Sequence, residues 1–205
     1  MTTIVLASRN AHKLEELRRV LLPMLAEAGV PNVELIGDDG PEPVENGLTY
    51  EENALIKARA AAERTGLPTV ADDSGIGVDV LGGSPGIFSA RWSGPAKDAG
   101  ENVDLLLWQL SDVPDGARGA TFNCAAALVM PDGREVVVRG EWPGAIARER
   151  RGSGGFGYDP IFIPDGDTRA AAELDPAEKD AVSHRRRAFT ALAPHVAELF
   201  GGAAR

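Results

Sequence analysis

Residues 3–21, TIVLASRNAHKLEELRRVL, contain the pattern that decides the fold. The apolar and β-branched run at residues 3–7 predicts a buried strand, and Ser8-Arg9-Asn10 predicts a polar turn after it. Leu14, Leu17 and Leu21 then follow at the spacing of one helix face. A strand, a turn and a helix in this order are typical of an α/β protein.

Further strands and helices alternate along the rest of the chain. Strands are predicted at residues 33–36, 69–71, 76–80, 120–129, 134–139 and 161–163, and helices at about 50–65, 101–110 and after residues 175 and 183. Thr49 and Glu52 have capping-box spacing, Gly66 closes that helix, and Pro194 is expected to kink or split the last one. The turn at residues 131–133 predicts a hairpin, so the central sheet should be mixed.

Composition and charge restrict the class of protein. The 205 residues suit one domain, residues 1–205, and the net charge of −10 argues against duplex DNA or an anionic membrane as the main partner. No apolar run approaches the roughly 18 residues of a membrane span, and the first residues lack a signal-peptide pattern. The single Cys124 lies in a predicted buried strand. We therefore expect a soluble, cytoplasmic protein.

The segment Ser8-Arg9-Asn10-Ala11-His12-Lys13 lies where the first predicted strand turns into a helix. Free backbone N–H groups, the helix dipole and the Lys13 ammonium could together bind a phosphate there. The alternative is an ordinary Ser/Asn helix cap with a solvated lysine. This hexapeptide alone favours the alternative, because most helix starts bind no ligand.

Asp72 and Asp73 are adjacent carboxylates, expected on a bend between two strands. Two neighbouring carboxylates repel unless a cation or donor groups compensate, and Mg²⁺ prefers such oxygen ligands. Adjacent aspartates also occur in solvated turns, as expected for Asp38-Asp39. Because the pair follows a predicted strand, a metal site and a solvated turn are about equally well supported.

Two further segments suggest ligand binding. Gly152, Gly154 and Gly157 match the spacing of a dinucleotide-binding loop, but a strand and not a helix follows them. The loop could instead close around a flat ligand, with Phe156 or Tyr158 stacking on a base, or be a surface loop with an aromatic plug.

Residues 183–187, SHRRR, put cations at a helix start, where the dipole disfavours them. A nucleic-acid patch is weakly supported on so acidic a chain.

Six segments in this order, SRNAHK, ENGLTYEENALIKA, ADDSGI, GGSPGIFSAR, GGFGYDPIF and SHRRRA, closely resemble the family of inosine/xanthosine triphosphate pyrophosphatases. The resemblance spans nearly the whole chain. It implies an α/β fold of two lobes around a long central mixed sheet with flanking helices, an active site in the cleft between the lobes, and usually a homodimer. It also implies Mg²⁺-dependent hydrolysis of ITP, dITP and XTP to the nucleoside monophosphate and pyrophosphate.

The resemblance further implies a role for each matching residue. Asp73 would be the catalytic proton acceptor, and Glu45 and Asp73 would bind Mg²⁺ with Asp72 beside them. The substrate-binding residues would be Ser8, Arg9, Asn10, Ala11, His12, Lys13, Asn53, Lys57, Ser74, Phe156, Gly157, Tyr158, Asp159, Lys179, His184 and Arg185. Of these, Arg9, Ala11 and His12 fall at positions that vary in the family.

Lys179 and Arg185 carry only hydrogen-bond donors, which suits the 6-oxo group of hypoxanthine or xanthine and leaves the 6-amino group of adenine unpaired. Two alternatives remain open at this point. One is a pyrophosphatase for modified pyrimidine or methylated nucleotides, and the other is a nucleotide sensor that does not hydrolyse its ligand. A panel of triphosphates separates all three.

Overall fold

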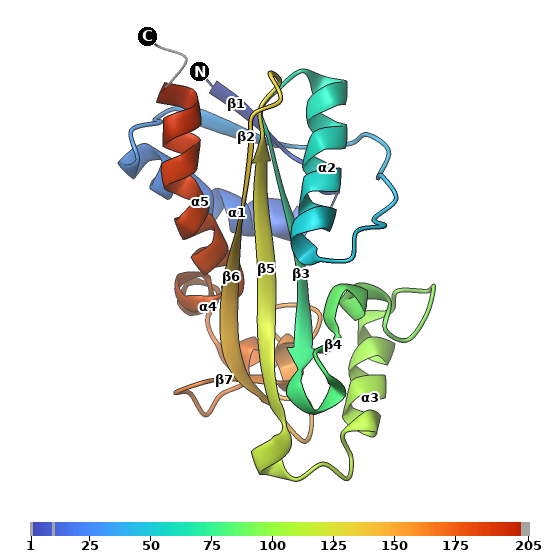
Figure 1. Ribbon diagram of the computed structural model, residues 1–205. Helices are drawn as coiled ribbons and strands as arrows, with labels where there is room; N and C mark the ends of the chain where they lie inside the picture. Colours follow the sequence, from blue (N-terminus) through green and yellow to red (C-terminus); the bar gives the residue numbers. More distant parts are fainter. Residues whose placement is uncertain (1, 10, 202–205) are drawn as a thin grey trace. The chain divides into compact units, whose positions relative to one another are not determined.

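The computed structural model describes residues 2–9 and 11–201, without the side chains of Ala11, His12 and Gly201 (Figure 1). Within them the strands are β1 (Thr2–Leu6), β2 (Val33–Gly37), β3 (Thr69–Val78), β4 (Ser84–Pro85), β5 (Gly119–Val129), β6 (Glu135–Ile146) and β7 (Phe162–Pro164). The α-helices are α1 (Ala11–Glu27), α2 (Tyr50–Thr65), α3 (Ala99–Gln109), α4 (Pro176–Val182) and α5 (His184–Gly201). The predicted α/β class is confirmed.

The described strands form one mixed sheet in the order β2-β1-β3-β5-β6-β7, with β4 paired to β3. β1 is parallel to β2 and to β3, because α1 and α2 cross over between these strands. β4 is antiparallel to β3, and β7 is antiparallel to β6. β5 and β6 are joined by a tight turn in which Met130 N donates to Arg134 O at 2.8 Å. The predicted mixed sheet is therefore confirmed.

Contacts divide the chain into two units. The first unit contains Met1–Asp73, Cys124–Gly140 and Arg185–Arg205, and the second contains Ser74–Asn123 and Glu141–His184. β3, β5 and β6 each contribute residues to both units, and α5 does so as well, since its first residue, His184, belongs to the second unit.

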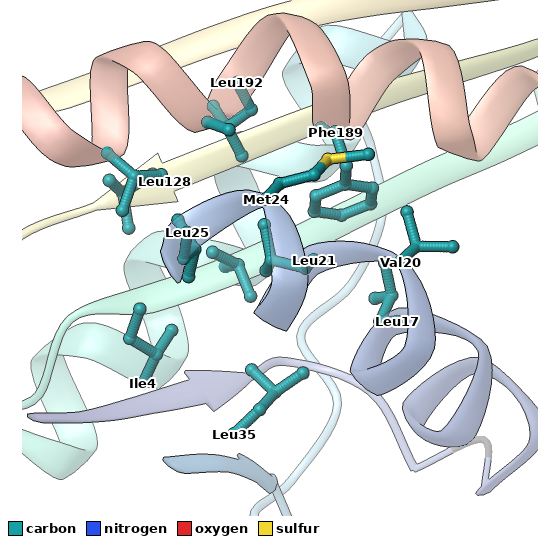
Figure 2. Packing of buried hydrophobic residues seen from close by; sticks show 14 of the residues in the cluster. Ile4, Leu17, Val20, Leu21, Met24, Leu25, Leu35, Leu128, Phe189 and Leu192 are labelled. Carbon is teal, nitrogen blue, oxygen red and sulfur yellow. The ribbon is translucent and has the colours of Figure 1, made fainter. Parts of the chain in front are cut away.

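In the first unit, α1 and α5 pack against the strands through a large apolar cluster (Figure 2). Leu17 and Leu21 of α1 and Phe189 of α5 are fully buried in it, together with Ile4 and Leu128 from the strands. α2 lies on the other side of these strands from α5 (Figure 1). The strands of this unit thus present one face to α1 and α5 and the opposite face to α2.

The second unit has its own core of α3 and aromatic side chains. Leu106 of α3 is fully buried there. Phe122 and Phe162 meet edge to face with ring centroids 4.6 Å apart, and Trp142 lies 5.2 Å from Phe162. Such contacts stabilise an aromatic pair beyond simple area burial. This unit therefore holds its strands and loops around a rigid aromatic centre.

The predicted boundaries of α2 are confirmed. Thr49 is the N-cap, and its Oγ1 accepts from Glu52 N at 3.1 Å. Gly66 closes the helix at φ 67°, in the left-handed region that favours glycine, and its N–H donates to Ala62 O. These two caps fix the orientation of α2, and with it the direction in which Asn53 and Lys57 point.

Asp72 and Asp73 do not lie on a bend between two strands, as the sequence suggested, but inside the continuous strand β3. Both side chains have cationic partners there, so their charges do not require a solvated turn. Val80 was expected in the following strand, but it lies in the 3₁₀ helix Asp79–Leu81 and is 51% exposed. Gly82, at φ 62°, ends that helix and turns the chain toward β4.

Other boundaries differ in smaller ways. β6 extends to Ile146, well beyond the predicted residue 139, because Gly144 to Ile146 pair with β7. α5 continues through Pro194 as one helix and is not split, since Leu192 and Val196 on either side of the proline are both buried in the core. Cys124 is buried in β5, as predicted. No helix of the described chain is long and apolar enough to span a membrane.

Leu21 and Leu22 provide a matched test of how α1 packs into the apolar cluster of the first unit. Leu21 is fully buried, whereas its neighbour Leu22 is only partly buried. We expect Leu21→Ala to lower the free energy of unfolding by about 2–5 kcal/mol, through lost burial and a residual cavity, and Leu22→Ala to cost clearly less. Urea denaturation followed by circular dichroism measures both. Equal losses would contradict the packing of α1.

Candidate active site

The site begins with two adjacent carboxylates that face in opposite directions. Successive side chains of a strand point to opposite faces of its sheet, so Asp72 and Asp73 in β3 diverge. Asp72 is directed to residues of α1 and α5, and Asp73 to residues of α2. The pair thus forms two separate clusters within the first unit.

Asp72 lies in a buried network of alternating charges. Its Oδ1 accepts from Lys13 Nζ at 3.0 Å and its Oδ2 accepts from Arg185 Nε at 3.1 Å. Arg185 Nη1 also donates to Glu16 Oε2 at 3.1 Å. Asp72, Glu16 and Arg185 are each less than 5% exposed. Two carboxylates and two cations therefore balance one another where water is excluded.

The electrostatics of this network fix its charge state. Burial alone would raise the pKa of Asp72, but the positive charges of Lys13, Arg185 and Lys57 outweigh it and hold that pKa far below the usual value. Burial would likewise lower the pKa of Arg185, but Glu16 and Asp72 raise it above the usual value. Asp72 remains an anion with both oxygens engaged by cations.

Asp73 is the less strongly engaged of the two aspartates. Its Oδ1 accepts from Lys57 Nζ at 2.7 Å, and its Oδ2 accepts a longer bond from Asn53 Nδ2 at 3.4 Å. Burial raises the pKa of Asp73 above its usual value; Lys57 offsets this in part, and Glu45 reinforces it. This carboxylate is thus a better proton acceptor than Asp72.

Glu45 reaches the same ammonium from a loop. Lys57 Nζ lies 3.2 Å from Glu45 Oε1 as well as 2.7 Å from Asp73 Oδ1. Burial would lower the pKa of Lys57, but the carboxylates of Asp73, Asp72 and Glu45 raise it. Lys57 is therefore a cation that two carboxylates from different elements share.

The loop that carries Glu45 is tied to the start of α2. Asn53 Oδ1 accepts from Gly47 N at 2.9 Å, and Glu52 Oε2 accepts from Leu48 N at 2.6 Å. A side chain on Gly47 would approach Asn53 Oδ1 to 2.7 Å, so the loop needs glycine there. Because its amide also donates to Asp73, Asn53 connects the positions of Glu45 and Asp73.

The predicted phosphate-binding segment is only partly described. Asn10 and the side chains of Ala11 and His12 lie outside the described residues. Arg9 is exposed, and its guanidinium donates to Gly40 O at 2.6 and 3.1 Å, which holds the turn at residues 38–40. Ser8 is partly buried before α1. Among the described side chains of this segment, that of Lys13 reaches Asp72.

The second unit contains another buried lysine–aspartate pair. Lys179 Nζ of α4 donates to Asp159 Oδ2 at 2.6 Å, and the same oxygen accepts from Phe156 N at 2.7 Å. The ammonium also lies 4.9 Å from the centre of the Phe156 ring. Gly155 has φ 67°, and a side chain there would collide with Asp159. The glycine-rich loop is thus closed on a carboxylate that holds a cation.

Phe156 and Tyr158 differ in accessibility. Phe156 is 36% exposed, whereas Tyr158 is 5% exposed and its hydroxyl donates to Ser89 O at 2.8 Å. Gly157 between them has φ 61°. Phe156 is therefore the more accessible of the two rings, and Tyr158 is part of the core.

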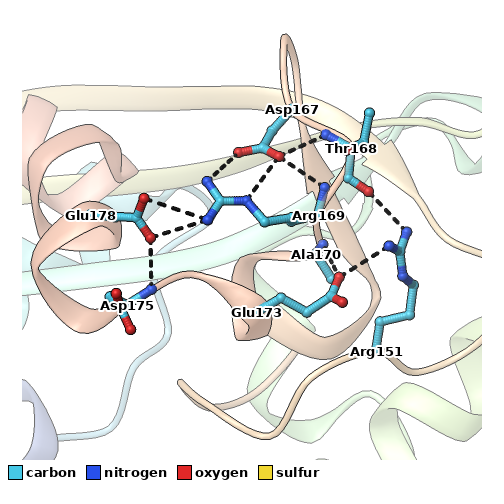
Figure 3. Close-up of polar contacts among 8 residues, drawn as sticks. All are labelled: Arg151, Asp167, Thr168, Arg169, Ala170, Glu173, Asp175 and Glu178. Atoms are coloured by element: carbon cyan, nitrogen blue, oxygen red, sulfur yellow. Dashed lines mark hydrogen bonds and ion pairs between the residues drawn. The ribbon is translucent and has the colours of Figure 1, made fainter.

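Surface ion pairs hold the N-terminal end of α4 (Figure 3). Arg169 connects Asp167 to Glu178, at 3.0 and 3.2 Å. Glu178 Oε2 in turn accepts from the backbone N of Asp175, the N-cap of the helix. Lys179 follows Glu178 in the chain, so this network orients the helix turn that presents the lysine.

The remaining predicted residues of the second unit are Ser74 and His184. His184 is 3% exposed, and its ring stacks on Phe122 at 4.8 Å and 8°. Ser74 is partly buried and follows Asp73 in β3. Sequence reasoning missed Glu16, which lies one helical turn after Lys13 and pairs with Arg185. That spacing was the available signal.

Among the described residues, no group of three or more His, Cys, Asp or Glu side chains is placed to hold a metal ion. Of the predicted metal ligands, Glu45 and Asp73 converge on one ammonium, and Asp72 points to the other face. Mg²⁺ is commonly bound by one or two carboxylates, with phosphate oxygens and water as its other ligands. The two converging carboxylates fit such an ion.

Comparison with known proteins gives matches over nearly the whole chain. The model of the Ham1 family matches residues 4–195. A Mycobacterium tuberculosis protein named dITP/XTP pyrophosphatase is 58% identical over 206 residues, with 98% of each chain covered. A Leifsonia xyli protein of the same name is 57% identical over 194 residues, with 95% of each covered.

Two solved structures are also similar. The structure of a nucleoside-triphosphatase / dITP/XTP pyrophosphatase from Mycobacterium abscessus is 55% identical, with a TM-score of 0.75 over 95% of this chain and 100% of that one. A HAM1 protein from Coxiella burnetii is 41% identical, with a TM-score of 0.84 over 97% and 100%. The mixed α/β sheet with flanking helices is the fold they share with this chain.

The two aspartates should differ in their effect on stability. Asp72→Asn removes the buried carboxylate that Arg185 and Lys13 share and leaves Glu16 alone to balance Arg185, so we expect a loss of about 3–5 kcal/mol in the free energy of unfolding at pH 7. Asp73→Asn should change the free energy of unfolding by less than about 1.5 kcal/mol, because burial already disfavours the charge of the Asp73 carboxylate. Urea denaturation of both variants provides the comparison.

The pH dependence gives a second readout of the same difference. The pKa of Asp72 is lower in the folded protein than in the unfolded chain, where it is about 4. The contribution of Asp72 to the free energy of unfolding is therefore present above about pH 4 and is lost as the pH falls toward the folded pKa. The deficit of Asp72→Asn should therefore shrink as the pH is lowered from 7 to 3. A deficit independent of pH would contradict the charged network.

Proposed function

The chain belongs to the Ham1 family, and from this premise we propose that it hydrolyses deaminated purine nucleoside triphosphates. The proposed substrates are ITP, dITP and XTP, and the products are the nucleoside monophosphate and pyrophosphate. The observation that carries the proposal is the cluster in which Lys57 is shared by Glu45 and Asp73. It supplies anionic groups for a metal, a cation for phosphate and a proton acceptor in one place.

For the cofactor we propose Mg²⁺, held by Glu45 and Asp73. Asp72 was expected beside them, but its two oxygens accept from Lys13 and Arg185 on the other face of β3, so we do not propose it as a ligand. Bound there, the ion would neutralise phosphate oxygens and make the α-phosphorus more susceptible to attack. Lys13 and Lys57 would bind phosphate oxygens through their ammonium groups. The first turn of α1, with Ser8 to His12 before Lys13, would add backbone donors.

Asp73 would hold the attacking water and accept its proton. Its raised pKa makes it more basic than a free aspartate, which suits a general base. The longer bond from Asn53 leaves Oδ2 the less tightly held of its two oxygens. Attack on the α-phosphorus expels pyrophosphate, which leaves the nucleoside monophosphate.

For the base we propose recognition by the second unit. Phe156 would stack on the purine, with Gly157, Tyr158 and Asp159 completing the loop, and Lys179 would donate to the 6-oxo group. Adenine presents a 6-amino donor instead and would leave that ammonium unpaired. His184 and Arg185 are further candidates, although both are buried and Arg185 is bound to Glu16 and Asp72.

We further propose that the two units act as one domain in a cytoplasmic homodimer. The strands shared by both units support a single domain. Exposed apolar side chains, with Trp108 73% and Phe88 49% exposed, support a surface for a second copy. The net charge of −10 supports neither nucleic acid nor an anionic membrane as a partner.

A triphosphate panel tests the function directly. With Mg²⁺ present, we expect pyrophosphate to be released from ITP, dITP and XTP with little from ATP, and no release without a divalent cation. Pyrophosphate and orthophosphate are measured separately. Orthophosphate as the first product would contradict the proposed cleavage, and preference for a pyrimidine or methylated nucleotide would contradict the proposed substrate.

Asp73→Asn separates chemistry from binding. This variant should lose at least about 1000-fold in kcat, which is the scale of a missing general base, while its affinity for a non-hydrolysable ITP analogue should fall by much less. Asp39→Asn, at an exposed aspartate, is the matched control. Single-turnover kinetics and calorimetry give the two quantities. Binding without turnover in the unaltered protein would instead indicate a sensor.

Lys179→Met tests base recognition. Losing a hydrogen bond from a charged donor is worth about 1.5–3 kcal/mol, so the ratio of kcat/KM for ITP over ATP should fall roughly 10- to 100-fold. Lys97→Met, at an exposed lysine of the same unit, should leave the ratio unchanged. An unchanged ratio in Lys179→Met would remove Lys179 from base selection.

A further inference from the structure

Lys57 occupies the position toward which two carboxylates of the cluster converge. Its ammonium lies 2.7 Å from Asp73 Oδ1 and 3.2 Å from Glu45 Oε1. The side chains of Lys57 and Asp73 are 13% and 12% exposed, and that of Glu45 is 36% exposed. The internal cation is thus largely shielded from water and held by two anions at once.

The same two carboxylates cannot hold Lys57 and a metal ion in the same place. An ammonium and a divalent cation repel strongly where water is scarce. The strand and the tied loop also limit how far the carboxylates can separate, since Asn53 bonds to both Gly47 N and Asp73. A metal that uses both carboxylates must therefore displace the ammonium.

The displaced ammonium needs another anion. Asp72 also attracts Lys57 electrostatically, but both of its oxygens already accept from Lys13 and Arg185, so it does not replace the two carboxylates as a direct partner of the ammonium. A triphosphate does, because it carries several anionic oxygens and lysine has a long, flexible stem. The nucleotide can thus compensate the charge that the metal displaces.

We propose that Lys57 excludes free Mg²⁺ from the Glu45–Asp73 pair and admits the metal only together with a triphosphate. This inference rests on the proposed function, since it concerns the metal of that reaction. Lys57 then acts as a place-holding cation that makes metal binding and nucleotide binding mutually dependent. Such coupling is reciprocal, so each ligand raises the affinity for the other by the same factor.

Metal binding without nucleotide tests the inference apart from activity. Isothermal titration calorimetry with MgCl₂ should give weak binding to the unaltered protein. Lys57→Met should bind Mg²⁺ at least about 10-fold more tightly, the effect of removing one nearby repelling charge at an intermediate dielectric constant. Equal affinity in the two proteins would overturn the inference.

Two controls distinguish place-holding from a general loss of charge. Lys57→Arg keeps a cation between the carboxylates and should bind free Mg²⁺ as weakly as the unaltered protein. Lys13→Met removes a cation that lies 3.0 Å from Asp72 Oδ1, outside the Glu45–Lys57–Asp73 contacts, so the affinity of this variant for Mg²⁺ should rise much less. If Lys13→Met increased the affinity for free Mg²⁺ as much as Lys57→Met does, the effect would come from net charge alone, and the inference would be overturned.

Folding and function are checked separately. Circular dichroism and thermal unfolding establish that each variant is folded, and Lys57→Gln replaces Lys57→Met if the latter is not. If no triphosphate is hydrolysed by the unaltered protein, the proposed function fails, but tighter Mg²⁺ binding by Lys57→Met would still support the place-holding role. Weak binding that persists in folded Lys57→Met and Lys57→Gln would refute that role alone.

Discussion

The chemistry of the first unit depends on one backbone constraint, the alternation of side chains along a β-strand. Asp72 and Asp73 are covalent neighbours, and on a bend their charges could have shared one solvated face. Inside β3 they are directed to opposite faces of the sheet. Each carboxylate therefore has its own set of cations: Lys13 and Arg185 for Asp72, and Lys57 for Asp73. The adjacent pair divides into a buried anion whose oxygens are both engaged by cations and a second anion that is more basic.

Burying charges in this way requires that their partners arrive at defined positions, because an unpaired charge in the interior is strongly destabilising. Apolar packing provides those positions. Lys13 is on α1 and Arg185 is on α5, and both helices are held against the strands by one cluster that includes Leu17 and Phe189 (Figure 2). A change in the packing of either helix would move a cation away from Asp72. The stability of this unit and the positions of the cations around Asp72 are therefore linked through the same core.

Periodicity, capping residues and turn chemistry predicted the class of fold and most elements, because these signals act over a few residues. Thr49 and Gly66 bound α2 as expected, and the hairpin turn after β5 made the sheet mixed. The continuity of β3 was not predictable in this way, since two aspartates interrupt its apolar pattern and their partners are distant. The spacing from Lys13 could mark Glu16 as a candidate, but Arg185 lies 169 residues away in sequence, so no local signal identified it as the partner of Glu16. Phe156 and Tyr158 looked equivalent in sequence until burial separated them.

The two units each hold the ammonium of a lysine by the same physical means. In each, a carboxylate from a strand or loop fixes the ammonium of a helical lysine before any ligand is present: Asp73 with Lys57, and Asp159 with Lys179. A cation held in this way loses little freedom when a ligand binds, which reduces the entropic cost of binding. The ligand must nevertheless compete with the carboxylate for the ammonium. A ligand with little charge would compete poorly for Lys57, whereas a triphosphate with its metal ion brings both several anionic oxygens and a cation for the carboxylates that lose their lysine. On the proposed function, the ion pair thus favours the complete metal–triphosphate over its separate parts.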